Sequence, residues 1–281
     1  MNFYLFNKNT NFDTQKVYIK KKYKPFFLGK LKRVGNLKKD GGYLITKKSL
    51  KNSQNLLSIG MGYDWSFEKS FYKLNTSKNK VISLDKNLSF KKLFKYSIYN
   101  FLTFFFLPSF KRMQRFLKLF DYYFFFSSKK CFHVLKNLSS TNGKETISLL
   151  KVLKKFNSKE IILKLDIEGY EYKILNDIIK SNDFLNVILI EFHNLNIFKN
   201  RKKFDFFFLN ISKKFYLSHF HINNADVIAK KHSFPRTLEL TFENKRQFKK
   251  INARKSKFNY PIKNLDFPSS KNALDYKIIF K

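Results

Sequence analysis

The stretch LLSIGMGYDWSFE, residues 56–68, decides the fold of this chain. Its first part, 56–59, is a short apolar run typical of a buried strand. Gly60 and Gly62 follow, and a helix-like segment begins near Ser66. Because glycine has no Cβ, such a turn lets the backbone approach a bound ligand closely. The stretch predicts a strand, a ligand-binding turn and a helix, although two turn glycines alone are weak evidence for a ligand site.

Strand-like and helix-like segments alternate along most of the remaining chain. Helical spacing covers 146–156, 170–179 and 200–214. Further strand-like runs cover 81–84, 132–135, 161–165, 187–192, 216–222 and 237–242. The last two runs are joined by a loop without a helix, which predicts an antiparallel edge hairpin. We therefore expect an α/β fold: a mostly parallel, seven-stranded sheet with helices on both faces.

The boundaries of these patterns suggest one domain with additions. We expect an N-terminal extension at 1–50, the sheet domain at 51–245 and a C-terminal extension at 246–281. An aromatic and basic insert interrupts the domain at about 90–130. Its most apolar part, 99–110, is too short to span a bilayer and is followed at once by basic residues. We expect a core or interfacial segment there, open to peripheral membrane contact, and no transmembrane segment.

The net charge of the chain is strongly positive. It has 57 Lys and Arg against 20 Asp and Glu, a formal +37. Such a charge attracts polyanions, including nucleic acid. Lys, Asn, Phe and Ile are abundant together, however, which favours compositional bias of an A+T-rich gene. Cys131 is the only cysteine, and the N-terminus lacks the pattern of a secretory signal; both fit a cytoplasmic location.

The chemistry of the glycine turn points to a nucleoside without phosphates. Asp85 ends the second strand-like run, about 20 residues on, where an acid can accept both ribose hydroxyls. The dinucleotide fingerprint needs a third glycine where this chain has Trp65. Asp64 suits the ammonium group of an amino acid better than a phosphate. These residues favour S-adenosylmethionine, bound by Gly60, Gly62, Asp64 and Asp85.

Carboxylates and histidines follow the later strands. The string KLDIEGYE, residues 164–171, holds Asp166 and Glu168, and the next strands end near His193 and His221. Because adjacent strand ends converge in such a sheet, we expect these groups to share one pocket. We predict three catalytic candidates, Asp166, His193 and His221, and three acceptor-binding candidates, Glu168, Asn223 and Asn224. Glu168 could instead begin a helix, and Asn224 could be a turn residue; His219 lies deeper in its strand and is read as structural.

Two ways of activating an acceptor remain open at this pocket. A hydroxyl is a poor nucleophile and benefits from a general base. His193 or His221 could take its proton, with Asp166 as the rival base. A divalent metal held by Asp166, Glu168 and His193 could instead lower the pKa of the hydroxyl. Mixed carboxylate and imidazole ligation does not single out one metal.

Four strings resemble the FkbM family of methyltransferases: LLSIGMGYDWSFE, LKLDIEGYEYKIL, IEFHN, and HFHINN followed by PRTLELTF. The resemblance covers approximately Arg33 to Glu243. It implies a Rossmann-like class I methyltransferase fold, S-adenosylmethionine as donor, and O-methylation of a sugar or another hydroxylated metabolite. The chain has Asp85-Lys86 where the family usually has Glu-Pro, and the insert matches no family motif.

Two other functions stay open at this stage. A nucleic-acid methyltransferase would keep the donor site and use the positive charge, but no nucleic-acid-binding module is recognisable. A catalytically inactive basic protein could use the same fold as a binding scaffold. No sequence feature specifies an oligomeric state.

Overall fold

A computed structural model describes residues 16–38, 41–74, 80–225, 235–270 and 275–281. Residues 1–15, on which the expectation of no secretory signal rests, lie outside the described residues. Within the described ranges, no helix is both long enough and apolar enough to cross a membrane.

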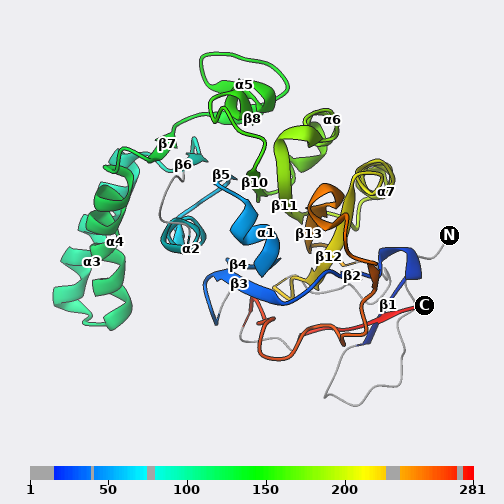
Figure 1. Ribbon diagram of the computed structural model, residues 1–281. Helices are drawn as coiled ribbons and strands as arrows, with labels where there is room; N and C mark the ends of the chain where they lie inside the picture. The colour runs from blue at the N-terminus through cyan, green and yellow to red at the C-terminus, as the bar shows by residue number, and fades with distance from the viewer. Residues whose placement is uncertain (1–15, 39–40, 75–79, 226–234, 271–274) are drawn as a thin grey trace.

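The core of the structure is a seven-stranded sheet (Figure 1). Its strands, in spatial order, are β12 (Phe215–Ile222), β13 (Leu238–Asn244), β11 (Leu185–Phe192), β10 (Ile161–Leu165), β5 (Asn55–Ile59), β6 (Lys80–Leu84) and β7 (Cys131–Val134). Only β13 runs antiparallel to its neighbours, β11 and β12. The predicted α/β class with a mostly parallel sheet and an antiparallel edge hairpin is confirmed.

Helices cover both faces of this sheet. One face carries α5 (Leu149–Lys154), α6 (Leu175–Lys180) and α7 (Phe198–Ile211), and the other carries α1 (Lys47–Asn52) and α2 (Ser66–Leu74) (Figure 1). Every residue of β5, β10 and β11 is buried. Strands buried on both faces read as continuous apolar runs, which is why the sequence marks them clearly.

Two predicted helices are shorter than their patterns. Thr146–Ser148 forms β9, so that α5 begins only at Leu149. The segment predicted as one helix at 170–179 is a 3-10 turn, η2 (Glu171–Lys173), followed by α6. The Glu171 carboxylate accepts a hydrogen bond from the backbone N–H of Gly169 and also contacts His193, so this segment is shaped by side-chain bonds as well as by helical spacing.

Four two-stranded sheets lie outside the main sheet in the described residues; three use segments near the two ends of the chain, and the fourth lies within 137–148. They are the pairs β1 (Lys16–Ile19) with β15 (Lys277–Phe280), β2 (Phe26–Phe27) with β14 (Arg254–Lys255), β3 (Leu31–Gly35) with β4 (Gly42–Thr46), and β8 (Asn137–Ser139) with β9. The remaining 3-10 turns are η1 (Lys21–Tyr23), η3 (Asn182–Phe184) and η4 (Lys245–Phe248). The pairing of β1 with β15 brings residues from the two extensions together.

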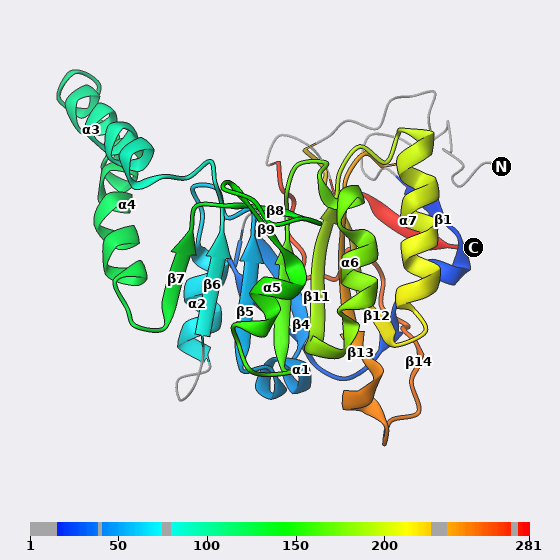
Figure 2. The same ribbon diagram turned by 90° about the horizontal axis from the view of Figure 1, so that it is seen from above.

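The aromatic and basic insert forms a pair of helices, α3 (Phe90–Phe106) and α4 (Phe110–Phe126). Ser89 and Ser109 cap their N-termini by accepting backbone N–H groups of Lys92 and Arg112. The pair projects from the β7 side of the molecule as a separate arm (Figures 1 and 2).

Candidate active site

A cavity of about 480 Å³ lies at the carboxyl ends of β5, β6 and β10. It is lined by Gly60 and Gly62 after β5, Asp85 after β6, and Asp166 and Glu168 after β10. Its volume is within the range of ordinary small-molecule sites. The structure therefore brings most of the predicted donor-site residues and the acidic string into one cavity.

Gly60 is required by the close approach of two chain segments. Its φ is +77°, and a Cβ built there would lie 1.5 Å from the carbonyl oxygen of Asp166. The residues that follow the neighbouring parallel strands β10 and β5 thus lie in direct contact. Gly62 also has a positive φ, +55°, but a Cβ there would meet nothing within 4 Å. The first glycine permits the fold, and the second keeps the turn open.

The Asp85 carboxylate is held beside this turn by backbone donors. Its Oδ2 accepts from the N–H of Gly62 at 2.8 Å. Its Oδ1 accepts from the N–H groups of Asn87 at 2.8 Å and Leu88 at 3.1 Å. Three backbone bonds orient the side chain without neutralising its charge, so it can still accept hydrogen bonds from a diol in the cavity.

Asp64 is placed differently from the other predicted donor-site residues. Its Oδ1 accepts from the backbone N–H of Ser66 at 2.9 Å, at the start of α2. It borders a separate depression with Lys69, Lys118 and Asp121, and does not line the cavity of Gly60 and Asp85. The Asp64 side chain accepts a hydrogen bond from a free N–H group at the start of α2, and it is turned away from the donor cavity.

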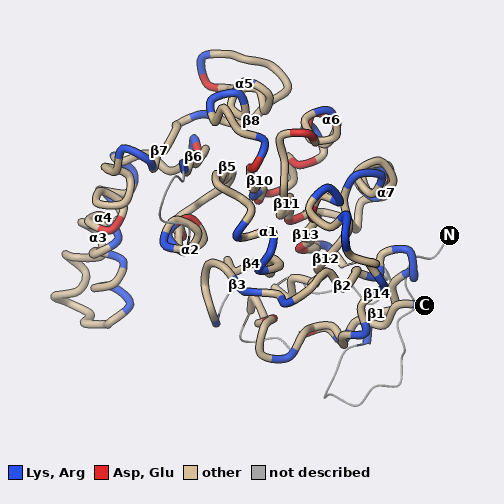
Figure 3. Tube along the Cα trace, in the orientation of Figure 1, with Lys and Arg blue, Asp and Glu red and all other residues tan. Residues whose placement is uncertain are grey.

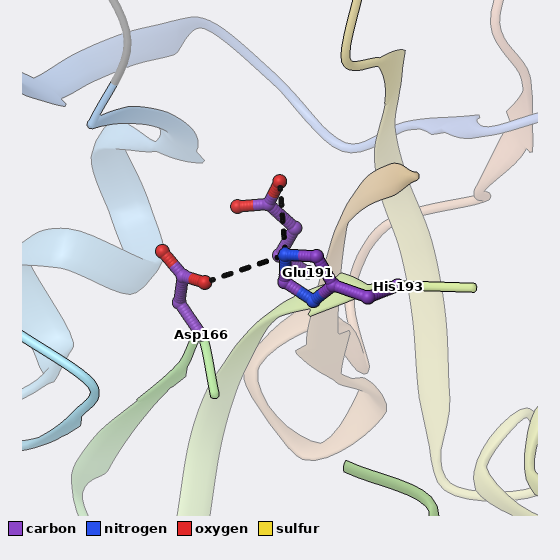
Figure 4. Close-up of side chains that lie close together, drawn as sticks. All are labelled: Asp166, Glu191 and His193. Atoms are coloured by element: carbon purple, nitrogen blue, oxygen red, sulfur yellow. Dashed lines mark ion pairs between the residues drawn. The ribbon is translucent and has the colours of Figure 1, made fainter. Parts of the chain in front are cut away.

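His193 lies just after β11, with four carboxylates around its ring. Figure 4 shows two of them, Asp166 and Glu191, each joined to the ring by a dashed line. The Nδ1 atom is 2.7 Å from Oε1 of the fully buried Glu171. The Nε2 atom lies 3.7–3.8 Å from carboxylate oxygens of Asp166, Glu168 and Glu191. Nδ1 is therefore held by one hydrogen bond, and Nε2 faces the three carboxylates of Asp166, Glu168 and Glu191, which we call the acidic rim.

This environment shifts the protonation of His193. Burial alone would lower the pKa of the imidazole, but the hydrogen bond and charge of Glu171, with the charges of Asp166 and Glu168, outweigh it. The pKa of His193 is raised above its ordinary value. The surrounding carboxylates thus stabilise the imidazolium form.

Asp166, Glu191 and His193 also form a group that could hold a metal ion. One ligand atom from each lies within 4.8 Å of the others. This group differs from the set expected from sequence, because Glu191 takes the place of Glu168. The Glu168 side chain is 87% exposed and sits in a turn with φ +54°. Glu191 is buried and accepts a hydrogen bond from Asn223 at 2.9 Å.

His221 has both ring nitrogens occupied. Nδ1 is 3.0 Å from Glu239 and Nε2 is 3.2 Å from Asp275, in a buried setting. Burial would lower its pKa, but Glu239 and Asp275 hold the pKa well above its ordinary value. Neither His221 nor His193 lines the main cavity itself. His193 contacts Asp166 and Glu168, which line it, whereas the partners of His221, Glu239 and Asp275, lie outside that lining. The geometry therefore does not bring this predicted catalytic residue to the donor site.

The remaining predicted residues have structural contacts. His219 pairs with the buried Asp266, at 2.9 Å. The Asn224 side chain donates a hydrogen bond to the carbonyl oxygen of Ser270 at 3.0 Å and accepts one from the backbone N–H of Ser270 at 2.7 Å. Asn223 reaches the site only through Glu191.

Two residues of this site were not among those predicted from sequence. Glu171 orients His193, and Glu191 faces its outer nitrogen. Glu171 ends the string KLDIEGYE, and Glu191 belongs to the string IEFHN. The pattern of 170–179 also contains Lys173 and Asp177, so nothing in it sets Glu171 apart as buried.

Comparison with known families gives one match. Residues 120–217 match the family described as methyltransferase FkbM domain. The matched part runs from α4 to β12 and contains Asp166, Glu168 and His193. It confirms the resemblance expected from the sequence over those residues. No curated protein matches the chain.

Solved structures with a similar course of the chain include two fibrillarins. One is the pre-rRNA processing protein fibrillarin of Methanococcus jannaschii, with 10% identity, a TM-score of 0.36, and coverage of 87% of this chain and 99% of that one. Another is Aeropyrum pernix fibrillarin with natively bound S-adenosyl-L-methionine, with 7% identity, a TM-score of 0.33, and coverage of 86% and 100%. At these TM-scores the likeness adds nothing to the assignment, which rests on the topology of this chain and on the domain match.

Proposed function

We propose that this S-adenosylmethionine-dependent methyltransferase, which carries an FkbM domain, transfers the methyl group to a hydroxyl of a sugar or saccharide-containing acceptor. The observation that carries the proposal is the arrangement of His193. Its inner nitrogen is bonded to Glu171, and its outer nitrogen faces the acidic rim of the donor cavity.

The residues of the cavity fit the donor. Gly60 and Gly62 leave room for close backbone approach, and Asp85 offers a carboxylate fixed at the end of β6. Such an acid is placed to accept the ribose hydroxyls of a nucleoside. When bound, S-adenosylmethionine supplies a methyl group already activated by a sulfonium. The protein then has to position the acceptor oxygen and remove its proton.

His193 is the residue that we assign to proton removal. Because its Nδ1–H donates to the Glu171 carboxylate, the neutral ring presents an Nε2 lone pair outward. That nitrogen takes the hydroxyl proton, and Asp166, Glu168 and Glu191 stabilise the imidazolium that results. His221 is not used, since both of its nitrogens already have partners.

The rim of the cavity provides the acceptor contacts. Glu168 and Tyr170 both line it, and both side chains are exposed. A carboxylate can accept hydrogen bonds from sugar hydroxyls, and an aromatic ring can pack against the apolar face of a sugar. Asn223 acts in this proposal through Glu191, and Asn224 holds the C-terminal segment.

A divalent cation between Asp166, Glu191 and His193 is the second way to activate the hydroxyl. The closeness of their ligand atoms, within 4.8 Å, favours it. The two ways are separated by measuring turnover after chelation and dialysis. Activity that survives chelation supports the base, and activity that is lost and then restored by added Mg²⁺ or Mn²⁺ supports the cation.

The test of the function is transfer of labelled methyl groups to fractionated acceptors. We expect label in saccharide fractions, and His193→Gln should lower turnover by about 10²–10⁴-fold. Donor affinity, measured by calorimetry, should stay unchanged in that variant. Label found only in RNA would overturn the acceptor proposal and support a nucleic-acid methyltransferase. Full turnover of His193→Gln would overturn the base assignment.

A further inference from the structure

The helical arm α3–α4 exposes an unusual amount of apolar surface at its outer end. Phe106 is 84% exposed and Phe110 is 77% exposed, on either side of the turn that joins the helices. Other large apolar side chains exposed in this region are Tyr99, Leu102, Phe105 and Leu107. A contiguous apolar patch of this kind marks an interaction surface.

The charged side chains of the arm lie on either side of an uncharged segment. Residues 96–110 contain none, whereas the arm as a whole, 90–126, has seven basic residues and one acidic residue. Lys111 and Arg115 are exposed on the first two turns of α4, directly behind the apolar end. Figure 3 shows the basic positions on both helices and the uncharged turn between them. The arm therefore has an apolar tip and a basic collar.

One face of α3 also carries basic side chains near the base of the arm and apolar side chains at its tip. Lys91, Lys95, Tyr99, Leu102 and Phe106 are all exposed, and their spacings of three and four residues place them in one stripe. From the base of the arm to its tip, the stripe changes from ammonium groups to an amphipathic ring and then to purely apolar side chains. At 1.5 Å per residue, Lys95 stands about 16 Å behind Phe106.

The base of the arm is firmly attached to the sheet domain. Leu93 and Leu119 are buried in a cluster with Met61, Trp65 and Leu88. The single acidic residue of the arm, Asp121, bonds the indole N–H of Trp65 at 2.8 Å and pairs with Lys69. Since Asp121 is engaged at the base, it does not offset the basic collar near the tip.

We propose that the arm docks the protein on the surface of an anionic lipid bilayer. The tip from Leu102 to Phe110 enters the interfacial region, while Lys111 and Arg115 contact lipid phosphates. Peripheral insertion of this kind needs apolar side chains at the interface and cations behind them. The proposal is independent of which hydroxyl the enzyme methylates.

A lipid surface fits the arm better than a nucleic acid does. Nucleic-acid surfaces interleave aromatic and basic side chains, so that rings stack on bases while cations contact phosphates. Here the cations are absent from the most exposed aromatic segment, 96–110. The leucines of the tip also have no flat face to stack on a base. Hydrocarbon is the environment that accepts Leu and Phe side chains together.

The experiment measures sedimentation of the full chain with phosphatidylcholine vesicles, with and without phosphatidylglycerol. We expect binding to the anionic vesicles that weakens at high salt, because the basic residues act through screened charges. Lys111→Glu with Arg115→Glu should weaken this binding by more than about tenfold, since each basic residue near an anionic surface contributes roughly a fivefold gain. Phe106→Ser with Phe110→Ser should also weaken it by about tenfold or more.

Matched controls come from other exposed parts of the chain. Leu209→Ser on α7 removes an exposed apolar side chain, and Lys249→Glu with Lys250→Glu reverses two exposed charges. Both should bind vesicles as the unaltered chain does. Donor affinity should be unchanged in the tip variants, which shows that they are folded. Phe106→Trp should show a blue-shifted emission component when anionic vesicles are added.

Two results would overturn the proposal. One is equal vesicle binding by the tip variants and the unaltered chain. The other is absence of vesicle binding together with tight binding of single-stranded RNA that the tip variants lose, which would assign the arm to nucleic acid.

Discussion

Replacing Gly60 by Ala tests the close contact between Gly60 and the backbone of Asp166, two residues that line the donor cavity. The new Cβ would lie 1.5 Å from the carbonyl oxygen of Asp166, a backbone atom that no side-chain rotation can move. The overlap should cost about 1–3 kcal/mol through forced shifts of the packed chain. The positive φ of +77° adds about 1–2 kcal/mol for a residue with a side chain. We expect a total loss of about 2–5 kcal/mol in the free energy of unfolding.

Gly62→Ala is the matched control, because its φ is also positive but its Cβ would meet nothing within 4 Å. It should lose only about 1–2 kcal/mol of stability. Its new methyl group points into open space at the donor turn. The loss in the free energy of donor binding should therefore exceed the loss in the free energy of unfolding. Urea denaturation gives the first quantity and calorimetry with S-adenosylmethionine the second. The reasoning is refuted if the two variants are equally stable, or if Gly60→Ala binds the donor as the unaltered chain does.

Three further predictions concern the carboxylates. Asp85→Asn should weaken donor binding by about tenfold with little change in turnover at saturating donor, because a charged acceptor of ribose hydrogen bonds is lost; unchanged calorimetric affinity would contradict the ribose role. Glu171→Gln should lower kcat with little change in KM, because it loosens the orientation of His193 and does not contact the acceptor. A change in KM alone would point to a different role for Glu171. Burial alone would raise the pKa of Asp266, but His219 lowers it to about 2. The ionised Asp266 therefore stabilises the fold above about pH 4, and about 2 kcal/mol is lost as the pH falls towards 2; acid titration followed by circular dichroism should show a smaller loss over this range in Asp266→Asn.

The sheet could be predicted from sequence because its central strands are buried on both faces. Runs such as 161–165 and 187–192 are apolar except for one charged residue each, and they form β10 and most of β11. The predictions of helices at 146–156 and 170–179 were less accurate. Helical spacing does not show that a short strand or a 3-10 turn precedes the helix. The division into two extensions and a sheet domain stays a prediction.

The contacts at the acidic rim depend on backbone conformations that the sequence does not reveal. Alternation along a strand would place Asp166 and Glu168 on one side, but β10 ends at Leu165. Glu168 and Gly169 instead adopt positive φ values of 54° and 99°. This turn still leaves both carboxylates close to Nε2 of His193, at 3.8 and 3.7 Å. The grouping was predictable from strand ends, whereas the pairing of His193 with Glu171 was not.

His221 shows how distant chain segments change the role of a strand residue. Its position on the same strand face as His219 follows from alternation, and the two rings stack 6.4 Å apart. Its partner Asp275 and the partner of His219, Asp266, both come from the C-terminal extension. Local pattern cannot show that an extension folds back over β12 and satisfies these imidazoles. A histidine at a strand end is therefore a catalytic candidate only until its nitrogens are accounted for.

The insert and the donor cavity are physically connected through Met61. This residue lies between the two glycines of the donor turn, lines the cavity, and is buried against Leu93 and Leu119 at the base of the arm. The base thus supports the donor turn, while the tip, several helical turns away, is free to contact another surface. Substitutions at the tip can change docking without changing donor affinity, whereas substitutions of Leu93 or Leu119 must change the packing of Met61. The sequence pattern predicts the insert as an interruption of the domain, but its inner half packs behind Met61, a residue that lines the donor cavity.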